Sequence, residues 1–165
     1  MKKPLKRFLF IFCVILLLGG GTFIWFNRQA MLTDAAGAGN LTAVGFLYLL
    51  GADLNGAPTD ESGEGGEYAL CAAVANGHED VVRFFIQHHA DLDIDFGDEG
   101  NPLALALTNY SMAELLLSNG ANPRHACYGR PIDRNNWNPP LDDRMFNLLK
   151  KYDAPTPSQS KPQSR

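Results

Sequence analysis

Acidic side chains dominate the middle of this chain. Residues 51 to 100 carry twelve Asp and Glu against one Arg, a net charge of −11, whereas residues 101 to 165 carry a net charge of +3. A surface of this sign attracts a basic protein face and speeds its association in a salt-sensitive way. Exposed loops would also need such acids simply to stay solvated. The acids can therefore be interpreted either as a docking surface or as a means of keeping the loops soluble. A nucleic-acid partner is disfavoured, because phosphate binding needs clustered cations.

Three of these acids have a spacing that invites a calcium site. Asp91, Asp93 and Asp95 alternate, but a calcium-binding loop requires glycine directly after the third acid, and Phe96 stands there. The alternation of polar and apolar residues over 92–96 instead predicts one arm of a short β-hairpin. We therefore predict no metal site at these acids.

Histidines and nucleophiles are scattered in the sequence. His88 and His89 are adjacent and cannot converge easily on one metal ion without outside ligands, while His78 lies in a predicted turn and His125 in a predicted hairpin. The sequence contains no nucleophile–base pair, P-loop or cofactor fingerprint. We predict that the protein binds no cofactor and is not an enzyme; a hydrolytic or metal-dependent enzyme is the less favoured alternative.

Helix pairs must position these side chains. Within residues 68–93, two apolar segments of about ten residues flank a breaker at 75–78, which predicts an antiparallel helix pair. A three-residue signature closes this unit and recurs along the chain, as Gly51-Ala52-Asp53, His89-Ala90-Asp91, Gly120-Ala121-Asn122 and, weakly, Asp153-Ala154-Pro155. The alanines are 38, 31 and 33 residues apart. One pair cannot bury both its faces alone, so the sequence predicts a row of such pairs.

The repeating unit resembles the ankyrin repeat, which has G-x-T-P-L-H-x-A-A before its first helix, G-H near the inter-helix turn and L-L-x-x-G-A at its end. The motifs that carry the resemblance are Leu70, Ala72-Ala73 and Gly77-His78 in the second unit, Pro102-Leu103, Leu115–Leu117 and Gly120-Ala121 in the third, and Pro131-Ile132 and Leu148-Leu149 in the fourth. The resemblance implies an all-α fold with short β-hairpin loops. About four repeats, at residues 30–55, 66–95, 99–124 and 128–155, would form a solenoid in which Leu70 and Leu103 are equivalent.

In this family the hairpin tips and first helices form the side on which partners dock. The resemblance therefore implies that the acids at the predicted tips bind the partner, namely Asp60, Glu61, Glu64, Glu67, Asp93, Asp95, Asp98 and Glu99. We predict a monomer that binds a protein with a basic face.

Several places depart from the family pattern. The expanded connection at 56–67 predicts a mobile, solvated segment, and Thr108–Tyr110 forms a shortened inter-helix turn. Two prolines at 139 and 140 must end a helix, so the last helix is predicted at 141–152, before a disordered tail at 156–165. His89 replaces the glycine that closes the second helix. The histidine must adopt a left-handed backbone, at a cost of up to about 1 kcal/mol.

The cysteines are predicted to be unpaired. Cys71 begins the first helix of the second unit and Cys127 precedes the fourth unit. Two helix-packing steps of about 10 Å separate them, beyond the roughly 7 Å between α-carbons that a disulfide tolerates. Cys13 lies inside an apolar run and is interpreted as part of it.

The N-terminus predicts a membrane anchor. Residues 1–7 carry four basic side chains, and residues 8–26 follow as nineteen residues without a charge. As a helix this run would be roughly 28 Å long, enough to cross a bilayer. The excess of positive charge before the run keeps the N-terminus in the cytoplasm. A cleaved signal peptide with its core at 8–18 is the alternative, and it would release the repeats as a soluble periplasmic or secreted protein.

These features together predict a single-pass protein of the inner membrane whose ankyrin-type repeats face the periplasm. The predicted function is recognition of a protein partner at the membrane surface. An immunity or inhibitor protein that neutralises a toxic effector in the same compartment is the alternative.

Overall fold

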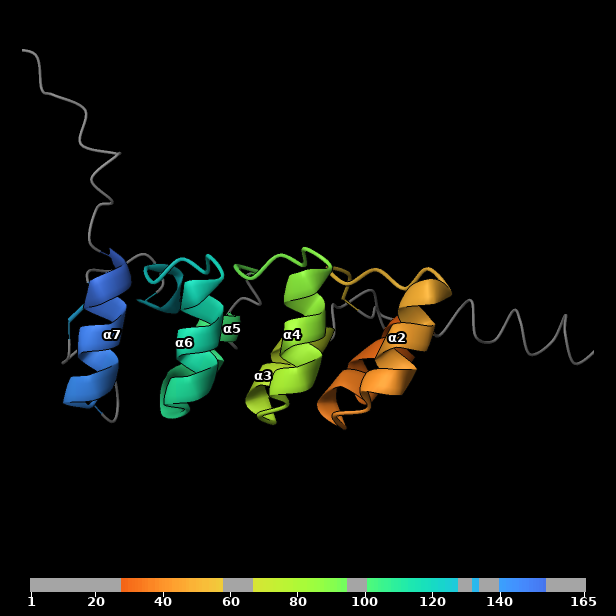
Figure 1. Ribbon diagram of the computed structural model, residues 1–165, viewed down its shortest axis with the longest axis horizontal. Helices are drawn as coiled ribbons and strands as arrows, with labels where there is room; N and C mark the ends of the chain where they lie inside the picture. The colour runs from red at the N-terminus through yellow and green to blue at the C-terminus, as the bar shows by residue number, and fades with distance from the viewer. Residues whose placement is uncertain (1–27, 58–66, 95–100, 128–131, 134–139, 154–165) are drawn as a thin grey trace, which may run out of the picture.

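A computed structural model describes residues 28–57, 67–94, 101–127, 132–133 and 140–153, which form a row of stacked helix pairs (Figure 1). The near layer contains the second helix of each pair: α2 (Leu41–Leu49), α4 (Glu79–Gln87), α6 (Tyr110–Ser118) and α7 (Asp143–Asp153). Behind them lie a helix at 28–37, α3 (Ala69–Ala75) and α5 (Pro102–Leu105) with its 3-10 extension η2 (Ala106–Thr108). A 3-10 turn, η3 (His125–Cys127), follows the third pair.

Local sequence sets the boundaries of the pairs. Gly39 and Gly77 have positive φ angles of 70° and 77°, which turn the chain between the first and second helix of a pair. Asn40 and Asn109 then cap the second helices, since their side chains accept hydrogen bonds from Ala43 N at 3.1 Å and Met112 N at 3.2 Å. The breaker predicted at 75–78 and the shortened turn predicted at Thr108–Tyr110 are both confirmed.

The second helices of the first three repeats close in the same way. In the first three repeats the backbone N–H of Ala52, Ala90 or Ala121 donates to a carbonyl five residues back, at 3.0 to 3.1 Å. The residue before each alanine is left-handed, with φ of 84° at Gly51, 57° at His89 and 103° at Gly120. This Schellman closure satisfies carbonyls that the helix end leaves free. The predicted left-handed backbone at His89 is confirmed.

The core is continuous through the stack. Leu32, Leu70 and Leu103 are fully buried in three successive first helices, and α3 contacts both α4 and α5. Leu70 and Leu103 therefore occupy equivalent places in neighbouring layers, as the repeat pattern predicts. At the far end Leu149 is fully buried and α7 contacts α6, so that helix closes the core.

The predicted β-hairpin arm at 92–96 is wrong over its described part. Residues 92 and 93 form a turn, and the described residues contain no strand. The cause is the side chain of Asp91, whose Oδ1 accepts a hydrogen bond from the N–H of Asp93 at 2.9 Å. This Asx turn bends the backbone where alternation alone suggested an extended one.

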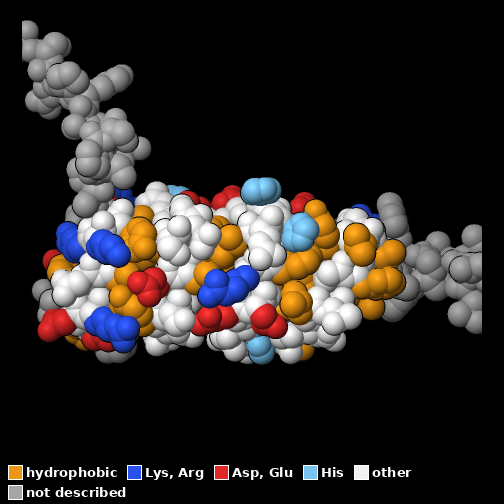
Figure 2. Space-filling view, in the orientation of Figure 1, with side chains coloured by type: hydrophobic (Ala, Val, Ile, Leu, Met, Phe, Trp, Pro, Cys, Tyr) orange, Lys and Arg blue, Asp and Glu red, His pale blue; other side chains and the backbone are white. Residues whose placement is uncertain are grey.

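The two ends of the row carry different surfaces (Figure 2). Charged side chains gather at the end formed by α7, whereas hydrophobic side chains gather at the end formed by α2. At the α7 end the guanidinium of Arg144 lies 3.6 Å from the centre of the Tyr110 ring on α6.

No helix in the described part of the chain is long and apolar enough to cross a membrane. The predicted span at 8–26, most of the predicted mobile segment at 56–67 and the predicted tail at 156–165 lie outside the described residues.

Candidate interaction surface

The loops that follow the second helices share one turn. In each of the first three repeats the residue after the closing alanine is Asp or Asn, and its Oδ1 accepts a hydrogen bond from the N–H two residues on. The donors are Asn55 for Asp53 at 3.0 Å, Asp93 for Asp91 at 2.9 Å and Arg124 for Asn122 at 3.0 Å. A short polar side chain is needed at this position because it must fold back onto its own backbone.

These turns are joined to one another across the repeats. The N–H of Asp91 donates to Asn55 Oδ1, and the N–H of Asn122 donates to Asp93 Oδ1, both at 2.8 Å. In the first two turns, the side chain of the third residue thus accepts a hydrogen bond from the backbone N–H of the first residue of the next turn. The bonds orient neighbouring loops relative to one another, independently of the helix packing beneath them.

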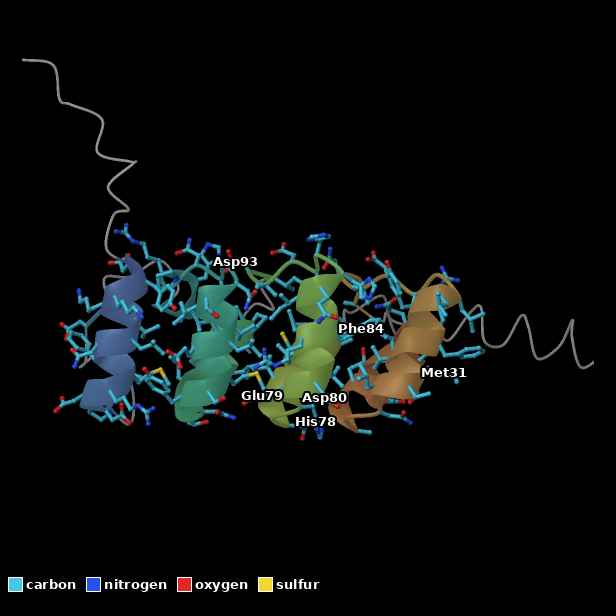
Figure 3. All side chains as sticks on the ribbon, viewed as in Figure 1. Met31, His78, Glu79, Asp80, Phe84 and Asp93 are labelled. Carbon is cyan, nitrogen blue, oxygen red and sulfur yellow. The ribbon has the colours of Figure 1, made fainter. Side chains whose placement is uncertain are left out.

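Gln29 extends this arrangement to the first helix. Its Oε1 accepts from the N–H of Asp53 at 3.2 Å, and its Nε2 donates to the carbonyl of Asp53 at 2.7 Å and to the carbonyl of Gly56. We call the connected set the tip ladder, formed by Gln29, Asp53, Asn55, Asp91, Asp93 and Asn122. It runs along one edge of the stack, the edge on which Figure 3 labels Asp93.

The tip ladder ends near two basic groups. His125 Nδ1 lies 3.4 Å from Asp93 Oδ1, and Arg124 Nε donates to Asp153 Oδ1 at 2.6 Å. The hydrogen bond from Arg124 to Asp153 and the charge of Asp153 raise the pKa of Arg124. The tip ladder therefore ends at the third repeat beside an Arg124–Asp153 ion pair.

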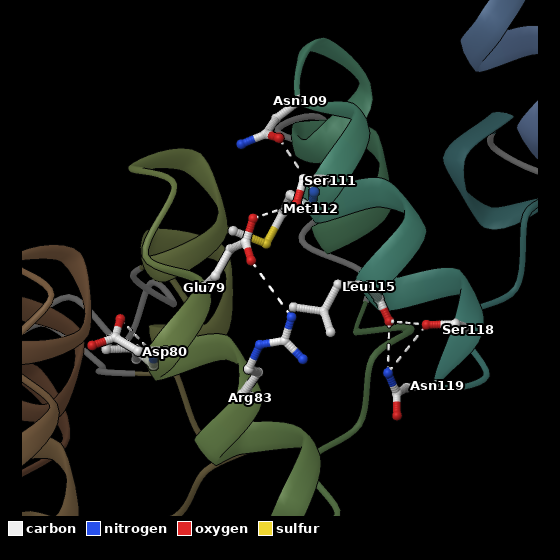
Figure 4. A network of polar contacts seen from close by, with 10 residues as sticks. Glu79, Asp80, Arg83, Asn109, Ser111, Met112, Leu115, Ser118 and Asn119 are labelled. Carbon is white, nitrogen blue, oxygen red and sulfur yellow. Dashed lines mark hydrogen bonds and ion pairs between the residues drawn. The ribbon is translucent and has the colours of Figure 1, made fainter.

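A second set of polar contacts joins repeats on the opposite edge, where Figure 3 labels His78, Glu79 and Asp80. Figure 4 shows Glu79 between Arg83, 3.6 Å away on its own helix, and Ser111, whose hydroxyl donates to it from α6. Arg83 is more than half exposed, and pairs of this kind contribute little to stability. The hydroxyl bond is the part of the network that crosses between repeats.

His78 has a structural role on this edge. It stands where the first and third repeats have Asn40 and Asn109, yet its side chain does not cap α4. Its Nε2 lies instead 3.0 Å from the carbonyl of Gly37 in the preceding repeat. A β-carbon on Gly39 would come within 2.5 Å of the His78 ring, so the glycine is required for this contact.

The comparison with known families agrees with this geometry. A family described as ankyrin repeats, in three copies, matches residues 32–126. The chain belongs to the ankyrin-repeat family. No curated protein matches the chain. Ankyrin repeats are typically interaction modules without enzymatic activity, because their stacked pairs expose an extended surface.

Two of the eight predicted partner-binding acids lie among the described residues of the ankyrin stack. Glu67 is exposed beside the second pair, and its carbonyl accepts from Thr33 Oγ1 at 3.2 Å. Asp93 is half-buried in the tip ladder, a structural role that the sequence did not suggest. Six lie outside the described residues, namely Asp60, Glu61, Glu64, Asp95, Asp98 and Glu99. The acidic docking surface stays a prediction.

The predicted free thiol at Cys71 is confirmed. Its side chain is fully buried and unpaired, and burial together with the charge of Glu67 raises its pKa to about 12. The thiol is therefore protonated and poorly reactive at neutral pH. The side chain of Cys127 lies outside the described part of the structure. Within the described residues no three His, Cys, Asp or Glu side chains are grouped as metal ligands.

Of the six members of the tip ladder, only Asp93 was among the predicted site residues, and the other five were missed: Gln29, Asp53, Asn55, Asp91 and Asn122. A signal for four of these five was present, because Asp or Asn follows the alanine in each of the first three repeats and a polar residue stands two positions later in every case. Gln29 carries no comparable signal, since its partners are 24 and 27 residues away.

Proposed function

We propose that this ankyrin-repeat protein is tethered to a membrane and binds a basic face of another protein through its loop tips and first helices, on the non-cytoplasmic side. The observation that carries the proposal is the tip ladder. Loops that are already ordered lose less conformational entropy when a partner binds, and this favours their use as a contact surface.

The charge of these loops supports a basic partner. Asp53, Asp91 and Asp93 each use one carboxylate oxygen to accept a backbone N–H within or between the turns. They belong to the stretch of residues 51–100 with a net charge of −11. A concentration of one sign along one edge steers an oppositely charged partner toward that edge.

The sequence before the stack supports the tether. The uncharged run at 8–26 comes after four basic residues, a pattern that inserts with the N-terminus in the cytoplasm and carries the C-terminal part of the chain across the membrane. The first described helix begins at residue 28, so the repeats would stand next to the bilayer.

Cross-linking with mass spectrometry in native membranes tests the proposal. We expect a protein partner whose cross-links concentrate at residues 56–67 and 93–100. Neutralising Glu64→Gln with Glu67→Gln should weaken these cross-links, and raising the salt concentration should do the same. Glu114→Gln, an exposed acid on α6, is the control and should have no effect. A partner that cross-links equally to all three proteins would contradict docking at the tips.

The identity of the partner distinguishes between two possible functions. Recovery of one secreted effector would favour an immunity or inhibitor protein, whereas recovery of a resident envelope protein would favour a scaffold.

A further inference from the structure

The first repeat exposes several large hydrophobic side chains. Every large hydrophobic side chain that is exposed among the described residues lies in this repeat: Met31, Leu41, Phe46, Leu49 and Leu50. We call these five residues the apolar end patch. Leu49 is 82% exposed and Phe46 is 60% exposed, so they are not edges of the core. The hydrophobic surface at the α2 end in Figure 2 corresponds to this region.

A comparison with the next repeats shows that the fold does not require leucine at three of these positions. Helices α2, α4 and α6 are each nine residues long and close in the same way, so their positions correspond one to one. The position of Leu49 holds Gln87 in the second repeat and Ser118 in the third. The position of Leu50 holds His88 and Asn119, and that of Leu41 holds Glu79 and Tyr110. Mostly polar residues thus fit these three positions, and the first repeat instead has leucine at each. The position of Phe46 is apolar in all three repeats, with Phe84 in the second and Leu115 in the third.

Charge is also scarce around the patch. Residues 28–57 contain three charged side chains, Arg28, Asp34 and Asp53. An exposed end of a repeat stack normally needs a polar outer face to stay soluble. Five exposed large hydrophobic side chains in a repeat with so little charge indicate that something other than water covers them.

We propose that the apolar end patch lies on the bilayer surface. The inference rests on the membrane tether of the proposed function. The uncharged run ends at residue 26 and the first described helix begins at 28, so at most about 10 Å of extended chain separates them. The end of the stack that carries Met31 is therefore held at the membrane interface (Figure 3).

The chemistry of the patch fits this occupant. Interfacial helices bury large aliphatic and aromatic side chains to a depth of about 5–10 Å at the boundary between headgroups and acyl chains. Met31, Phe46 and Leu49 are of this kind. A second copy of the chain would have to approach the same end at which its partner enters the bilayer, which leaves lipid as the occupant that the chain path favours.

Depth-dependent quenching tests the inference on the full chain. The chain carries Cys13→Ser and Cys127→Ser and is reconstituted in vesicles of phosphatidylethanolamine and phosphatidylglycerol. Cys71 is retained, because its raised pKa keeps it unreactive. A polarity-sensitive fluorophore is attached at Leu49→Cys and, separately, at Met31→Cys. Gln87→Cys is the matched control, since it occupies the position of Leu49 in the second repeat. Nitroxide-labelled lipids serve as quenchers.

We expect the probes at 49 and 31 to shift to the blue and to lose most of their emission to the nitroxide lipids, while the probe at 87 keeps its emission. Flotation of the vesicles reports separately on the tether. A chain that floats while probe 49 behaves like probe 87 would overturn the lipid contact and leave the tether intact. A blue-shifted probe 49 that lipids do not quench would show a protein contact and overturn the inference as well. A chain that fails to float would overturn the tether itself.

Discussion

The two ends of the stack differ in the residues on the side that no neighbouring repeat covers. Helix α7 buries Met145, Leu148 and Leu149 and exposes Arg144, Lys150, Lys151 and other polar side chains to the solvent. Helix α2 buries Val44 and Leu47 and exposes Phe46, Leu49 and Leu50. Each helix has one neighbouring repeat, so each has a side that no repeat covers. The uncovered side is polar at the α7 end and apolar at the α2 end, where we propose that the bilayer covers it.

The inner faces of the two ends are alike, because each buries a leucine in the core. Substituting these leucines is expected to have the largest effect on the free energy of unfolding. Leu32 in the first helix and Leu149 in the last are both fully buried. We expect Leu32→Ala and Leu149→Ala each to lower the free energy of unfolding by about 3 kcal/mol, because each leaves a cavity in the core. Denaturant unfolding of the full chain in detergent measures this. A loss below about 1 kcal/mol for Leu32→Ala would mean that the first helix does not share the core.

The polar side-chain contacts at the two ends differ in their number and in their expected contribution to stability. Gln29 makes three hydrogen bonds to the loop at 53–56, whereas Arg124 makes an exposed ion pair with Asp153. We expect Gln29→Ala to lower the free energy of unfolding by about 1 kcal/mol, because it leaves the N–H of Asp53 without its partner. Arg124→Ala is the comparison and should cost less, since exposed pairs contribute little. Equal losses in the same unfolding assay would contradict this ranking.

The helix closures distinguish the middle of the stack from the repeats on either side. Gly51 and Gly120 close the flanking repeats, and His89 closes the second with φ of 57°. We expect His89→Gly to raise the free energy of unfolding by up to about 1 kcal/mol, because glycine adopts this backbone without steric cost. Gly120→Ala should have the opposite sign. No atom lies within 4 Å of its added β-carbon, so backbone strain would be the cause. A neutral His89→Gly would show that the histidine side chain compensates for the strain.

The smallest expected effect tests whether the apolar end patch is needed for folding. The triple substitution Leu41→Glu, Leu49→Gln and Leu50→His installs the residues of the second repeat at the same positions. We expect the free energy of unfolding to change by less than about 0.5 kcal/mol, since exposed side chains contribute little to the folded state. A loss of several times that size in the same detergent would show that the patch packs within the chain, and the contrast between the two ends would fail.

Much of the fold was predictable because its signals are local. The breaker at 75–78, the shortened turn before Tyr110 and the left-handed backbone at His89 all depend on residues within one helical turn of one another. The fold class followed from the recurrence of such units. The hairpin arm at 92–96 failed because a side-chain hydrogen bond from Asp91 competed with the alternating pattern.

The candidate surface was less predictable, because its contacts join distant residues. Asp93 appeared to be a free acid at a loop tip, but its carboxylate accepts the N–H of Asn122, 29 residues away. Glu67 carried no sign that its carbonyl would meet Thr33 of the preceding repeat. A charge count identifies an acidic edge, but it does not show which acids hold the loops together.

By itself the sequence determined that helix pairs repeat, where each pair turns and how each second helix ends, because backbone propensity and capping act over a few residues. Only the tertiary structure decided which of the equivalent surfaces stay uncovered. Leu49 and Leu70 are both leucines in helices, yet one is exposed and the other fully buried. The difference arises because Leu70 lies between neighbouring layers of the stack, whereas Leu49 lies on a face of the first repeat that no other repeat covers.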